Sequence, residues 1–520
     1  MNPIEELYAL QETRGYLAEK DLRALSERRR IPLYELEGIA SFYPHFRRRP
    51  PPALRVGACR DLSCHLRDRG HAVRELESLC AGRDDVEFEA ISCPGLCDRA
   101  PACLVNDVPA APTDVAGYLA DPSSLREDAP TPAPRRWQTD PYTSVGERYG
   151  ELRKLARSRD FDGMIARISG SGLRGMGGAG FPTGRKWELV RKQAATPKYV
   201  VCNADESEPG AFKDRVILEE LPHLVIEGMA LAALAVGAEQ GWIYIRHEYQ
   251  RPRAALRRAL DEAYERGVLG ESVCGSGHRF DLQIFVSPGG YILGEETALL
   301  KALEGRRGEP RNKPPFPGTQ GLHRKPTLIN NVETLAHVPR VLRTGTADLK
   351  FFSVSGDVVE PGVIEAPLGI TLREIVDHTG GMRAGKQLLA FLPGGASTGF
   401  LASERADVRM DWESLHEAGT ALGAGAVVVV GSGADLLELG GNLTAFFRNE
   451  SCGKCVPCRI GTEKAVILIE RREEDGLAIL PELNETLLET SLCGLGQVAL
   501  TPILSIVENF PRSARAEEDS

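Results

Sequence analysis

The chain has 520 residues, of which 42% are hydrophobic and 26% are charged, and its formal net charge at pH 7 is −10. This length exceeds what one hydrophobic core usually serves, so we expect several domains. The acidic balance argues against nucleic acid as a partner, and no apolar run is long enough to cross a bilayer. Residues 1–10 contain acidic side chains and no apolar core, which predicts a protein without a signal peptide, cytoplasmic and without direct membrane insertion.

Residues 1–50 predict a helical N-terminal segment, because Leu22, Leu25, Leu33 and Leu36 follow helical spacing between charged residues. So short a segment cannot build a robust core, and we expect it to pack on another part of the chain. The proline-rich stretch Arg47–Pro52 then predicts a hinge.

Residues 53–120 alternate between strand and helix patterns, which is typical of a small α/β domain of thioredoxin-like character. The predicted strands are Leu54–Gly57, Val86–Ser92 and Cys103–Val105, and the predicted helices are Ser63–Cys80 and Thr113–Leu119.

Four cysteines lie where strands of this domain pass into loops: Cys59, Cys64, Cys93 and Cys97. Thiolates on two adjacent loops can hold a [2Fe–2S] cluster. Zinc also accepts closely spaced cysteine pairs, so a zinc site, or a thioredoxin-like scaffold without a cluster, is the alternative.

The rest of the chain divides by composition. Residues 121–148 are polar and proline-rich at their start, which predicts a linker, and residues 149–345 alternate strands with helices, which predicts an α/β sheet with its ligand at the strand ends. Residues 346–420 are rich in strand and turn signals, residues 421–512 are helical, and residues 513–520 form a tail. We see no chemistry in residues 346–420 and expect a structural spacer there.

The stretch GLRGMGGAGFPTGRKW, Gly172–Trp187, is the most distinctive of the chain. Glycine lets a backbone turn tightly and approach a ligand, so that its N–H groups can hold phosphate. The spacing fits neither the Walker pattern nor the usual dinucleotide fingerprint. Taken alone, the stretch could equally be a mobile surface loop.

A second cysteine group, Cys452, Cys455 and Cys458 with the distant Cys493, predicts a [4Fe–4S] cluster. Three thiolates on one tight turn hold one face of a cubane and the fourth completes it, while a structural zinc site is the alternative. The scattered Cys80, Cys103, Cys202 and Cys274 are expected to be small buried side chains.

The glycine stretch is followed by NADESEPG (203–210), GEETALL (294–300), KPPFP (313–317), NNVET (330–334) and ESCGKCVPCRIG (450–461). In this order they resemble the flavin-bearing NADH dehydrogenase subunit of bacterial complex I. The same subunit type occurs as the diaphorase of NAD-reducing hydrogenases and of NAD-dependent molybdenum or tungsten formate dehydrogenases. The N-terminal cysteine domain resembles the small [2Fe–2S] subunit of complex I, here fused ahead of the flavin subunit.

The resemblance implies a multidomain α/β fold: a helical prefix, a thioredoxin-like [2Fe–2S] domain, a Rossmann-like domain for FMN and NAD, a β-grasp (SLBB) domain and a C-terminal helical bundle with [4Fe–4S]. It also implies cofactor-binding residues, with Glu208 near the nicotinamide and no catalytic side chain, because FMN itself performs the hydride chemistry. The implied positions are Gly172, Arg174, Gly175, Gly177, Gly178, Ala179, Gly180, Phe181, Lys186, Asn203, Asp205, Glu206, Glu208, Tyr291, Gly294, Glu295, Glu296, Phe316, Asn330, Asn331 and Thr334.

Two of these assignments concern the nicotinamide cofactor. Phe181 and Phe316 match the aromatic residues that flank the adenine, although plain core packing is the alternative for both. Glu295 and Glu296 can accept hydrogen bonds from ribose hydroxyls and would repel a 2′-phosphate, which predicts a preference for NAD(H). Met176 departs from the family, because many relatives have Arg at its position.

The implied function is an NAD(H)-dependent flavin and iron–sulfur oxidoreductase, a diaphorase that exchanges hydride between NAD(H) and FMN and single electrons with clusters. The glycine stretch, FSVSGDVVEPGV (352–363) and LPGGAS (392–397) most resemble the beta subunit of NAD-dependent formate dehydrogenases. We therefore expect a catalytic partner, a molybdenum or tungsten formate dehydrogenase alpha subunit with iron–sulfur clusters. The alternatives are a hydrogenase diaphorase, a complex I-like module, or a non-catalytic nucleotide-binding scaffold.

Overall fold

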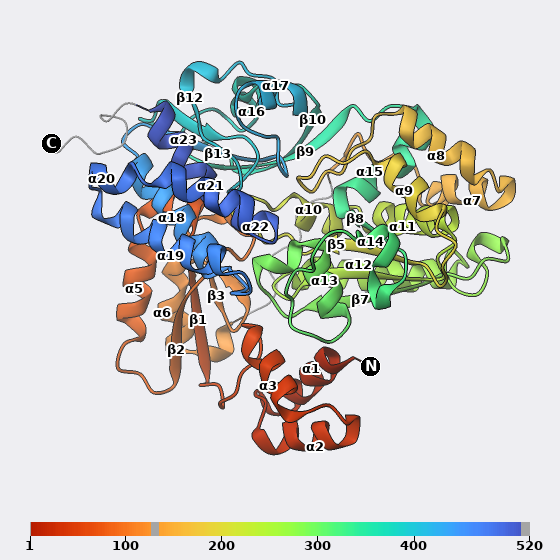
Figure 1. The fold of residues 1–520 in the computed structure, drawn as a ribbon, viewed down its shortest axis with the longest axis horizontal. Coiled ribbons are helices and arrows are strands. Elements are labelled where there is room, and N and C mark those ends of the chain that lie inside the picture. Colours follow the sequence, from red (N-terminus) through yellow and green to blue (C-terminus); the bar gives the residue numbers. More distant parts are fainter. Residues whose placement is uncertain (1, 126–134, 511–520) are drawn as a thin grey trace.

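A computed structural model describes residues 2–125 and 135–510 (Figure 1). Part of the predicted linker and the whole predicted tail, 513–520, lie outside the described residues. The chain forms three separate sheets, and its C-terminal helices lie between the first and the third of them. Among helices in the described ranges, none combines the length and apolar composition that a membrane span needs.

The N-terminal segment is helical, as predicted, and packs against the α/β domain. Asn2 caps the first helix in a capping box with Glu5, and its side-chain amide donates to the carbonyl oxygen of Leu303 at 3.0 Å. The hydroxyl of Tyr43 donates to Arg306 O at 2.5 Å. The three helices are α1 (Pro3–Arg14), α2 (Glu19–Arg29) and α3 (Leu33–Phe42).

The thioredoxin-like domain has a four-stranded sheet in the order β2-β1-β3-β4, with β1 parallel to β2 and antiparallel to β3. The predicted single helix over 63–80 is wrong: Arg69 and Gly70 take left-handed backbone angles, φ 52° and 72°, and split it in two. The elements are β1 (Leu54–Cys59), α4 (Leu62–Asp68), α5 (His71–Cys80), β2 (Val86–Ile91), β3 (Cys103–Val105), β4 (Val108–Ala110) and α6 (Val115–Ala120).

The second sheet is wholly parallel, with strands in the order β7-β6-β5-β8. Its strands are β5 (Tyr199–Ala204), β6 (Gln240–Arg246), β7 (Asp281–Ser287) and β8 (Thr327–Asn331). Parallel strands end at the same edge, and the register pairs Asn203 with Asn331 there. Two of the motifs found in the sequence therefore meet at this edge.

Helices cover both faces of this sheet, as expected for an α/β domain. They are α7 (Gly150–Ser158), α8 (Phe161–Gly170), α9 (Thr183–Arg191), α10 (Lys213–Glu220), α11 (Pro222–Val236), α12 (Gln250–Glu265), α13 (Glu296–Leu303), α14 (Pro317–Gln320) and α15 (Val332–Thr344). Helix α11 is buried along nearly its whole length and packs closely on α15.

The third sheet has the order β10-β9-β13-β11-β12. The predicted start of the helical region at residue 421 is wrong, because β13 (Ala426–Gly431) lies between β9 and β11 inside this sheet. Its six residues are all buried, so they form a central strand rather than a helix. The other elements are β9 (Leu349–Gly356), β10 (Gly362–Pro367), α16 (Leu372–His378), β11 (Leu388–Leu392), β12 (Leu401–Ala402) and α17 (Trp412–Glu417).

The C-terminal helices pack on the thioredoxin-like domain. The side chain of Asn442 accepts from Leu62 N at 2.7 Å and donates to Arg60 O at 2.9 Å, and His65 Nε2 lies 2.9 Å from Glu438 Oε1. The helices are α18 (Leu436–Asn449), α19 (Val456–Arg471), α20 (Glu474–Leu477), α21 (Leu480–Thr490), α22 (Gly494–Val498) and α23 (Thr501–Asn509).

The close contact between α11 and α15 yields a stability prediction. A Cβ atom at Gly228 would overlap the carbonyl oxygen of Leu335, so Gly228→Ala should force the helices apart and destabilise the fold by about 1–3 kcal/mol. Gly170→Ala is the control, because that helical glycine faces open space and Ala is the better helix former. Denaturant unfolding measures both, and equal stability of the two variants would contradict this account.

Candidate functional site

A cavity of about 480 Å³ lies at the carboxyl ends of β5 and β8. Such an edge is where open α/β sheets place their ligands, and the volume is in the range of ligand pockets. Its wall also includes residues of the third sheet's loops and of α22. The residues that line it are Gly177, Gly178, Ala179, Asn203, Asp205, Glu206, Ser207, Glu208, Ala211, Lys213, Asp214, Tyr291, Ile292, Gly294, Glu295, Asn331, Ser397, Thr398, Ala421, Gly423, Ala424, Gly494, Leu495 and Val498.

The glycine stretch forms a hydrogen-bonded turn against the start of α15. Gly175 N donates to Phe181 O at 2.9 Å, and Met176 N donates to Thr334 Oγ1 at 2.9 Å. A Cβ atom at Gly177 would stand 2.9 Å from the Cβ of Asn331, so only glycine permits this approach. The close fit brings the loop backbone of Gly177 and Gly178 to the cavity surface.

Three carboxyl groups after β5 form one side of the cavity. Burial raises the pKa of Asp205 to about 7, and its two oxygens accept from the hydroxyls of Ser207 and Ser287. Burial also raises the pKa of Glu206 to about 7, and its oxygens accept from the first backbone N–H groups of α10. Both side chains are therefore fixed in place before any ligand binds.

Glu208, the third carboxyl group, reaches across to the loop after β11. Its Oε1 accepts from the backbone N of Ser397 at 2.8 Å and from the Ser397 hydroxyl at 2.5 Å. Burial raises the pKa of Glu208, while the bonds from Ser397 lower it. The expectation that residues 346–420 form only a spacer is wrong, since Ser397 and Thr398 line the cavity.

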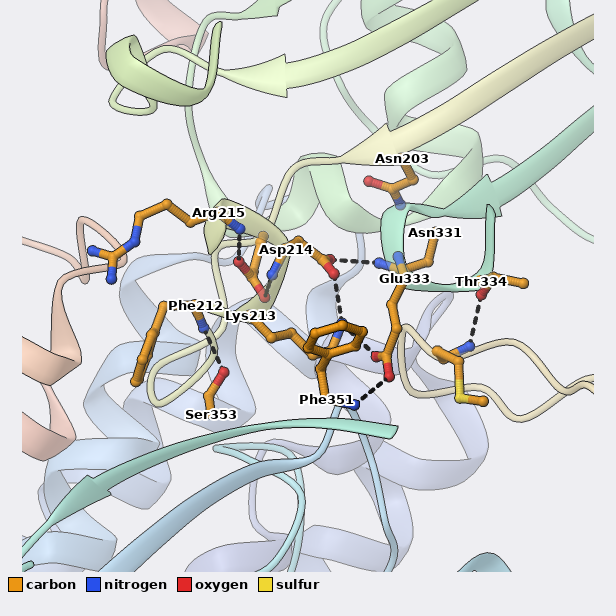
Figure 2. Close-up of polar contacts among 12 residues, drawn as sticks. Asn203, Phe212, Lys213, Asp214, Arg215, Asn331, Glu333, Thr334, Phe351 and Ser353 are labelled. Carbon is orange, nitrogen blue, oxygen red and sulfur yellow. Dashed lines mark hydrogen bonds and ion pairs between the residues drawn. The ribbon is translucent and has the colours of Figure 1, made fainter. Parts of the chain in front are cut away.

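A buried ionic network borders the cavity (Figure 2). Lys213 Nζ lies 2.6 Å from Asp214 Oδ1 and 3.0 Å from Glu333 Oε2. Glu333 also accepts from Lys350 Nζ at 3.1 Å and from the backbone N of Phe351 at 2.8 Å. The network therefore connects α10, the start of α15 and strand β9 of the third sheet.

Two lysines partly offset the negative charges of Glu295 and Glu296, a pairing that the sequence did not predict. Lys313 Nζ lies 2.8 Å from Glu295 and 3.0 Å from Glu296, and Lys186 Nζ lies 3.6 Å from Glu296. Burial opposes ionisation of Glu296, but the two lysines hold its pKa below the usual value. Glu295 also caps α13 by accepting from Thr297 N and Ala298 N, at 2.8 and 2.9 Å.

The two phenylalanines singled out in the sequence are exposed, Phe181 by 41% and Phe316 by 59%. Core packing is therefore wrong for both. Exposed aromatic rings can stack on a planar ligand.

Several predicted residues do not line the cavity. Asn330 is buried and accepts from Trp187 Nε1 at 2.9 Å, and Arg174 points to α17, where it lies 2.8 Å from Glu413. The others outside the cavity wall are Gly172, Gly175, Gly180, Phe181, Lys186, Glu296, Phe316 and Thr334.

Several residues that line the cavity were not predicted from the sequence, among them residues of the loop before α10, of the loops of the third sheet and of α22. Lys213 and Asp214 follow the NADESEPG motif directly, and that proximity was the available signal. Ser397 is the last residue of the LPGGAS stretch, which suggested a family resemblance but no site. Gly423 and Ala424 have no signal in the sequence, because only the fold of the third sheet brings them to the cavity.

The N-terminal cysteines gather between β1 and the loop after β2, and all four are buried. The Sγ atoms of Cys93 and Cys97 are 3.3 Å apart. Hydrogen bonds from Cys59 and Cys97 lower the pKa of Cys93 well below its ordinary value. Gly210 N, in the loop that carries Glu208, donates to Cys97 Sγ at 3.3 Å.

The C-terminal cysteines lie at two helix starts. Cys455 precedes α19, Cys458 lies in its first turn, and Cys493 precedes α22. A Cβ atom at Gly496 would stand 3.0 Å from the Cβ of Cys458, which is the close approach expected for the second loop. Cys458 is buried, whereas Cys452, Cys455 and Cys493 are partly exposed.

None of the twelve cysteines is in a disulfide within the residues that the structure describes. Cys80, Cys103 and Cys202 are buried, but Cys274 is only partly so. Within residues 2–125 and 135–510, no three His, Cys, Asp or Glu side chains are arranged to hold a single metal ion. The donor set of each cysteine group, four thiols from two neighbouring segments, fits an iron–sulfur cluster.

Four family models match the chain. They are the Nuo51 FMN-binding domain over 168–340, the NADH-ubiquinone oxidoreductase-F iron-sulfur binding region over 438–517, the thioredoxin-like [2Fe-2S] ferredoxin over 2–117 and the SLBB domain over 351–401. The predicted fold class is therefore confirmed, and so are FMN, [4Fe–4S] and [2Fe–2S] as cofactors. For both cysteine groups these models describe iron–sulfur sites and not the zinc sites considered as alternatives.

Individual relatives cover most of the chain. An NADH-quinone oxidoreductase F-type subunit of Rhizobium meliloti is 43% identical over 70% of this chain and 91% of that protein. The NADP-reducing hydrogenase subunit HndC of Solidesulfovibrio fructosivorans is 42% identical over 68% of this chain and 75% of that protein. A solved structure of an NAD+-reducing [NiFe]-hydrogenase aligns with a TM-score of 0.86 and 30% identity, over 99% of this chain and 94% of that chain.

Proposed function

Because the chain belongs to the family of F-type NADH-quinone oxidoreductase subunits, with a thioredoxin-like [2Fe–2S] domain fused at its N-terminus, we propose that the cavity at the ends of β5 and β8 holds the FMN. The chain is an NADH-dependent flavin and iron–sulfur oxidoreductase. The observation that carries the cavity assignment is the convergence of the glycine turn, the β5 carboxyl groups and Asn331 on one wall.

Bound FMN supplies the conversion between hydride transfer and single-electron transfer. The protein supplies position. Gly177 and Gly178 offer backbone N–H groups, and Asn203, Asp205 and Asn331 offer side-chain partners for the hydroxyls of the ribityl chain. Asn203 is fixed by its bond to Gly294 O at 2.9 Å, so its orientation does not depend on the ligand.

The nicotinamide cofactor is proposed to enter over the exposed Phe181 and Phe316, which would stack on its adenine. Glu295 and Glu296 would accept from its ribose hydroxyls, with Lys186 and Lys313 holding them in place. Glu208 would lie near the nicotinamide, oriented by Ser397.

Electrons are proposed to leave through the C-terminal cysteines. Gly494 and Leu495 line the cavity and follow Cys493 directly, so the cluster site adjoins the flavin site. Cys452 and Cys455 are partly exposed, and the neighbouring Val456 and Ile460 are largely exposed. An apolar surface beside a cluster site suits a partner subunit that exchanges electrons there.

We propose that this partner is the catalytic subunit of a molybdenum or tungsten formate dehydrogenase, which would make this chain its beta subunit. The support is the fused N-terminal domain together with the glycine stretch, residues 352–363 and residues 392–397. A hydrogenase diaphorase is the second candidate, because the aligned [NiFe]-hydrogenase chain covers 99% of this chain, the N-terminal domain included.

Purification of the native complex through a tag on this chain tests the assignment. We expect formate, and not hydrogen, to drive NAD+ reduction by the complex, and we expect molybdenum or tungsten in its metal content. Hydrogen-driven reduction with nickel in the complex would establish the hydrogenase candidate instead.

The role of the C-terminal cysteines gives a mutational prediction. Cys455→Ala removes one of four thiolates, so NADH should still bleach the flavin absorbance, while NADH-dependent reduction of the partner's centres should be lost. Cys274→Ser is the control, because that thiol belongs to neither cysteine group and should leave both signals unchanged. If Cys455→Ala reduces the partner as fast as the wild type does, Cys455 has no role in electron transfer to the partner.

Cofactor choice is open to test, because the name of one relative describes it as NADP-reducing. Glu296→Gln keeps the shape and removes one charge near the ribose, so the ratio of NADPH to NADH efficiency should rise. Since Lys186 and Lys313 already offset the acidic pair, we expect only about a two- to tenfold rise, equivalent to ~0.4–1.4 kcal/mol.

Steady-state kinetics with an artificial acceptor give kcat/KM for NADPH and for NADH, and hence this ratio. Glu188→Gln is the control, because Glu188 is exposed and pairs with Lys192 on the surface of α9. Glu295→Gln is less suitable, because Glu295 also caps α13. If the ratio stays constant in Glu296→Gln, the charge of this residue does not select the cofactor.

A further inference from the structure

Arg246, the last residue of β6, contacts loops of two different domains at once. Its Nη1 donates at 2.5 Å to the carbonyl oxygen of Glu206, in the loop after β5 that lines the cavity. Its Nη2 donates at 2.9 Å to the carbonyl oxygen of Cys93, in the cysteine loop, residues 93–97, of the thioredoxin-like domain. The guanidinium group is therefore held against one of the four N-terminal cysteines.

This guanidinium group is buried, and Glu248 is its counter-ion. Only 4% of the Arg246 side chain is exposed, and its Nε and Nη2 donate to the two carboxylate oxygens of Glu248 at 3.0 and 2.6 Å. Arg246 bonds directly to Cys93, whereas Glu248 is joined to that cysteine through Arg246. The positive member of the pair is therefore the one in contact with the cysteine loop.

The charge of Arg246 acts on the sulfur of Cys93. Hydrogen bonds from Cys59 and Cys97 lower the pKa of Cys93 most, burial opposes them, and the nearby positive charge of Arg246 lowers this pKa further. A charge that favours a thiolate over a thiol also favours the reduced state of a bound cluster, because reduction adds an electron. Since all four cysteines are buried, the low local dielectric strengthens this interaction.

Tyr249 reinforces the contact between the two loops. Its hydroxyl donates to Glu206 Oε2 at 3.0 Å, and a Cβ atom at Gly95 would stand 2.5 Å from that hydroxyl. Gly95 lies in the cysteine loop, so Tyr249 and Arg246 together hold this loop against the one that carries Glu206. The fold thus restricts movement of the guanidinium group relative to the cysteines.

We propose that Arg246 is a positioning residue that raises the reduction potential of the N-terminal [2Fe–2S] cluster. This role requires that Cys59, Cys64, Cys93 and Cys97 hold the cluster. Net charge and hydrogen bonds around the sulfur ligands are means by which a protein sets such a potential. The carboxylate of Glu248 limits the effect of Arg246 and should act in the opposite direction.

Two variants with opposite expected shifts test this role. Both are made in the full-length chain with its cofactors, and the potential is measured by redox titration of the [2Fe–2S] signal in electron paramagnetic resonance. Arg246→Gln removes the positive charge, so the midpoint potential should fall, whereas Glu248→Gln removes the negative charge and should raise it. We expect each variant to change the equilibrium between oxidised and reduced cluster about tenfold, which equals ~59 mV for a one-electron couple.

A third variant separates the charge of Arg246 from its geometry. Arg246→Lys keeps the positive charge but lacks the planar fork of donors, so its potential should stay closer to the wild type than that of Arg246→Gln. The C-terminal [4Fe–4S] cluster is the internal reference, and its potential should not move in any of the variants. Arg340→Gln is the matched control, because Arg340 is largely buried and pairs with Asp348 at 2.6 Å in a turn that contains no cysteine.

Shifts of the same sign in Arg246→Gln and Glu248→Gln would overturn the proposal, because loosened packing admits water to the cluster in either variant regardless of charge. Unchanged potentials would overturn it too. If Arg246→Gln does not assemble the cluster, Glu248→Gln decides, and anything but a rise in potential contradicts the proposal. A wild-type chain without a [2Fe–2S] signal would remove this role, while bleaching of its flavin by NADH would leave the proposed function intact.

Discussion

The carboxylate of Glu333 is the interaction on which the site depends. It is fully buried, and it accepts from Lys213, Lys350 and the backbone of Phe351. Burial alone would raise its pKa, but Lys350 and Lys213 lower it well below the ordinary value, so Glu333 is ionised in the folded protein. Removing one partner of such a buried network typically lowers the free energy of unfolding by ~3–5 kcal/mol. The charge that remains is left buried, without a partner and without hydration.

The position of this network explains how two domains build one cavity. Glu333 begins α15 of the parallel sheet domain, and Lys350 and Phe351 belong to the first strand of the third sheet. Ser397, in the loop after β11 of the third sheet, also donates a backbone hydrogen bond to Glu208. The SLBB domain thus contributes to the wall of the cavity, although its sequence contains no motif for chemistry.

A second set of contacts joins the N-terminal cysteine group to the loop after β5, which lines the cavity. Arg246 donates to Glu206 O at 2.5 Å and to Cys93 O at 2.9 Å, and Gly210 N donates to the Cys97 sulfur. The acidic loop after β5 therefore touches both the cavity and the cluster loop. The fused domain is integrated with the flavin domain rather than suspended from it by the linker.

The local features could be predicted from the sequence: an α/β sheet within residues 149–345, both cysteine groups and the motifs that meet at β5 and β8. These follow from periodicity, glycine spacing and thiol spacing, which act over a few residues. The split of the predicted helix is local, since Asp68 accepts from the backbone N of Gly70 and of Ala72. The strand β13, in contrast, depended on β9 and β11, which are distant in the chain. The pairing of Lys213 with Glu333, and of Lys313 with the acidic pair, was likewise decided only by the tertiary structure, because the energy of a charge depends on which partners the fold brings within a few ångströms of it.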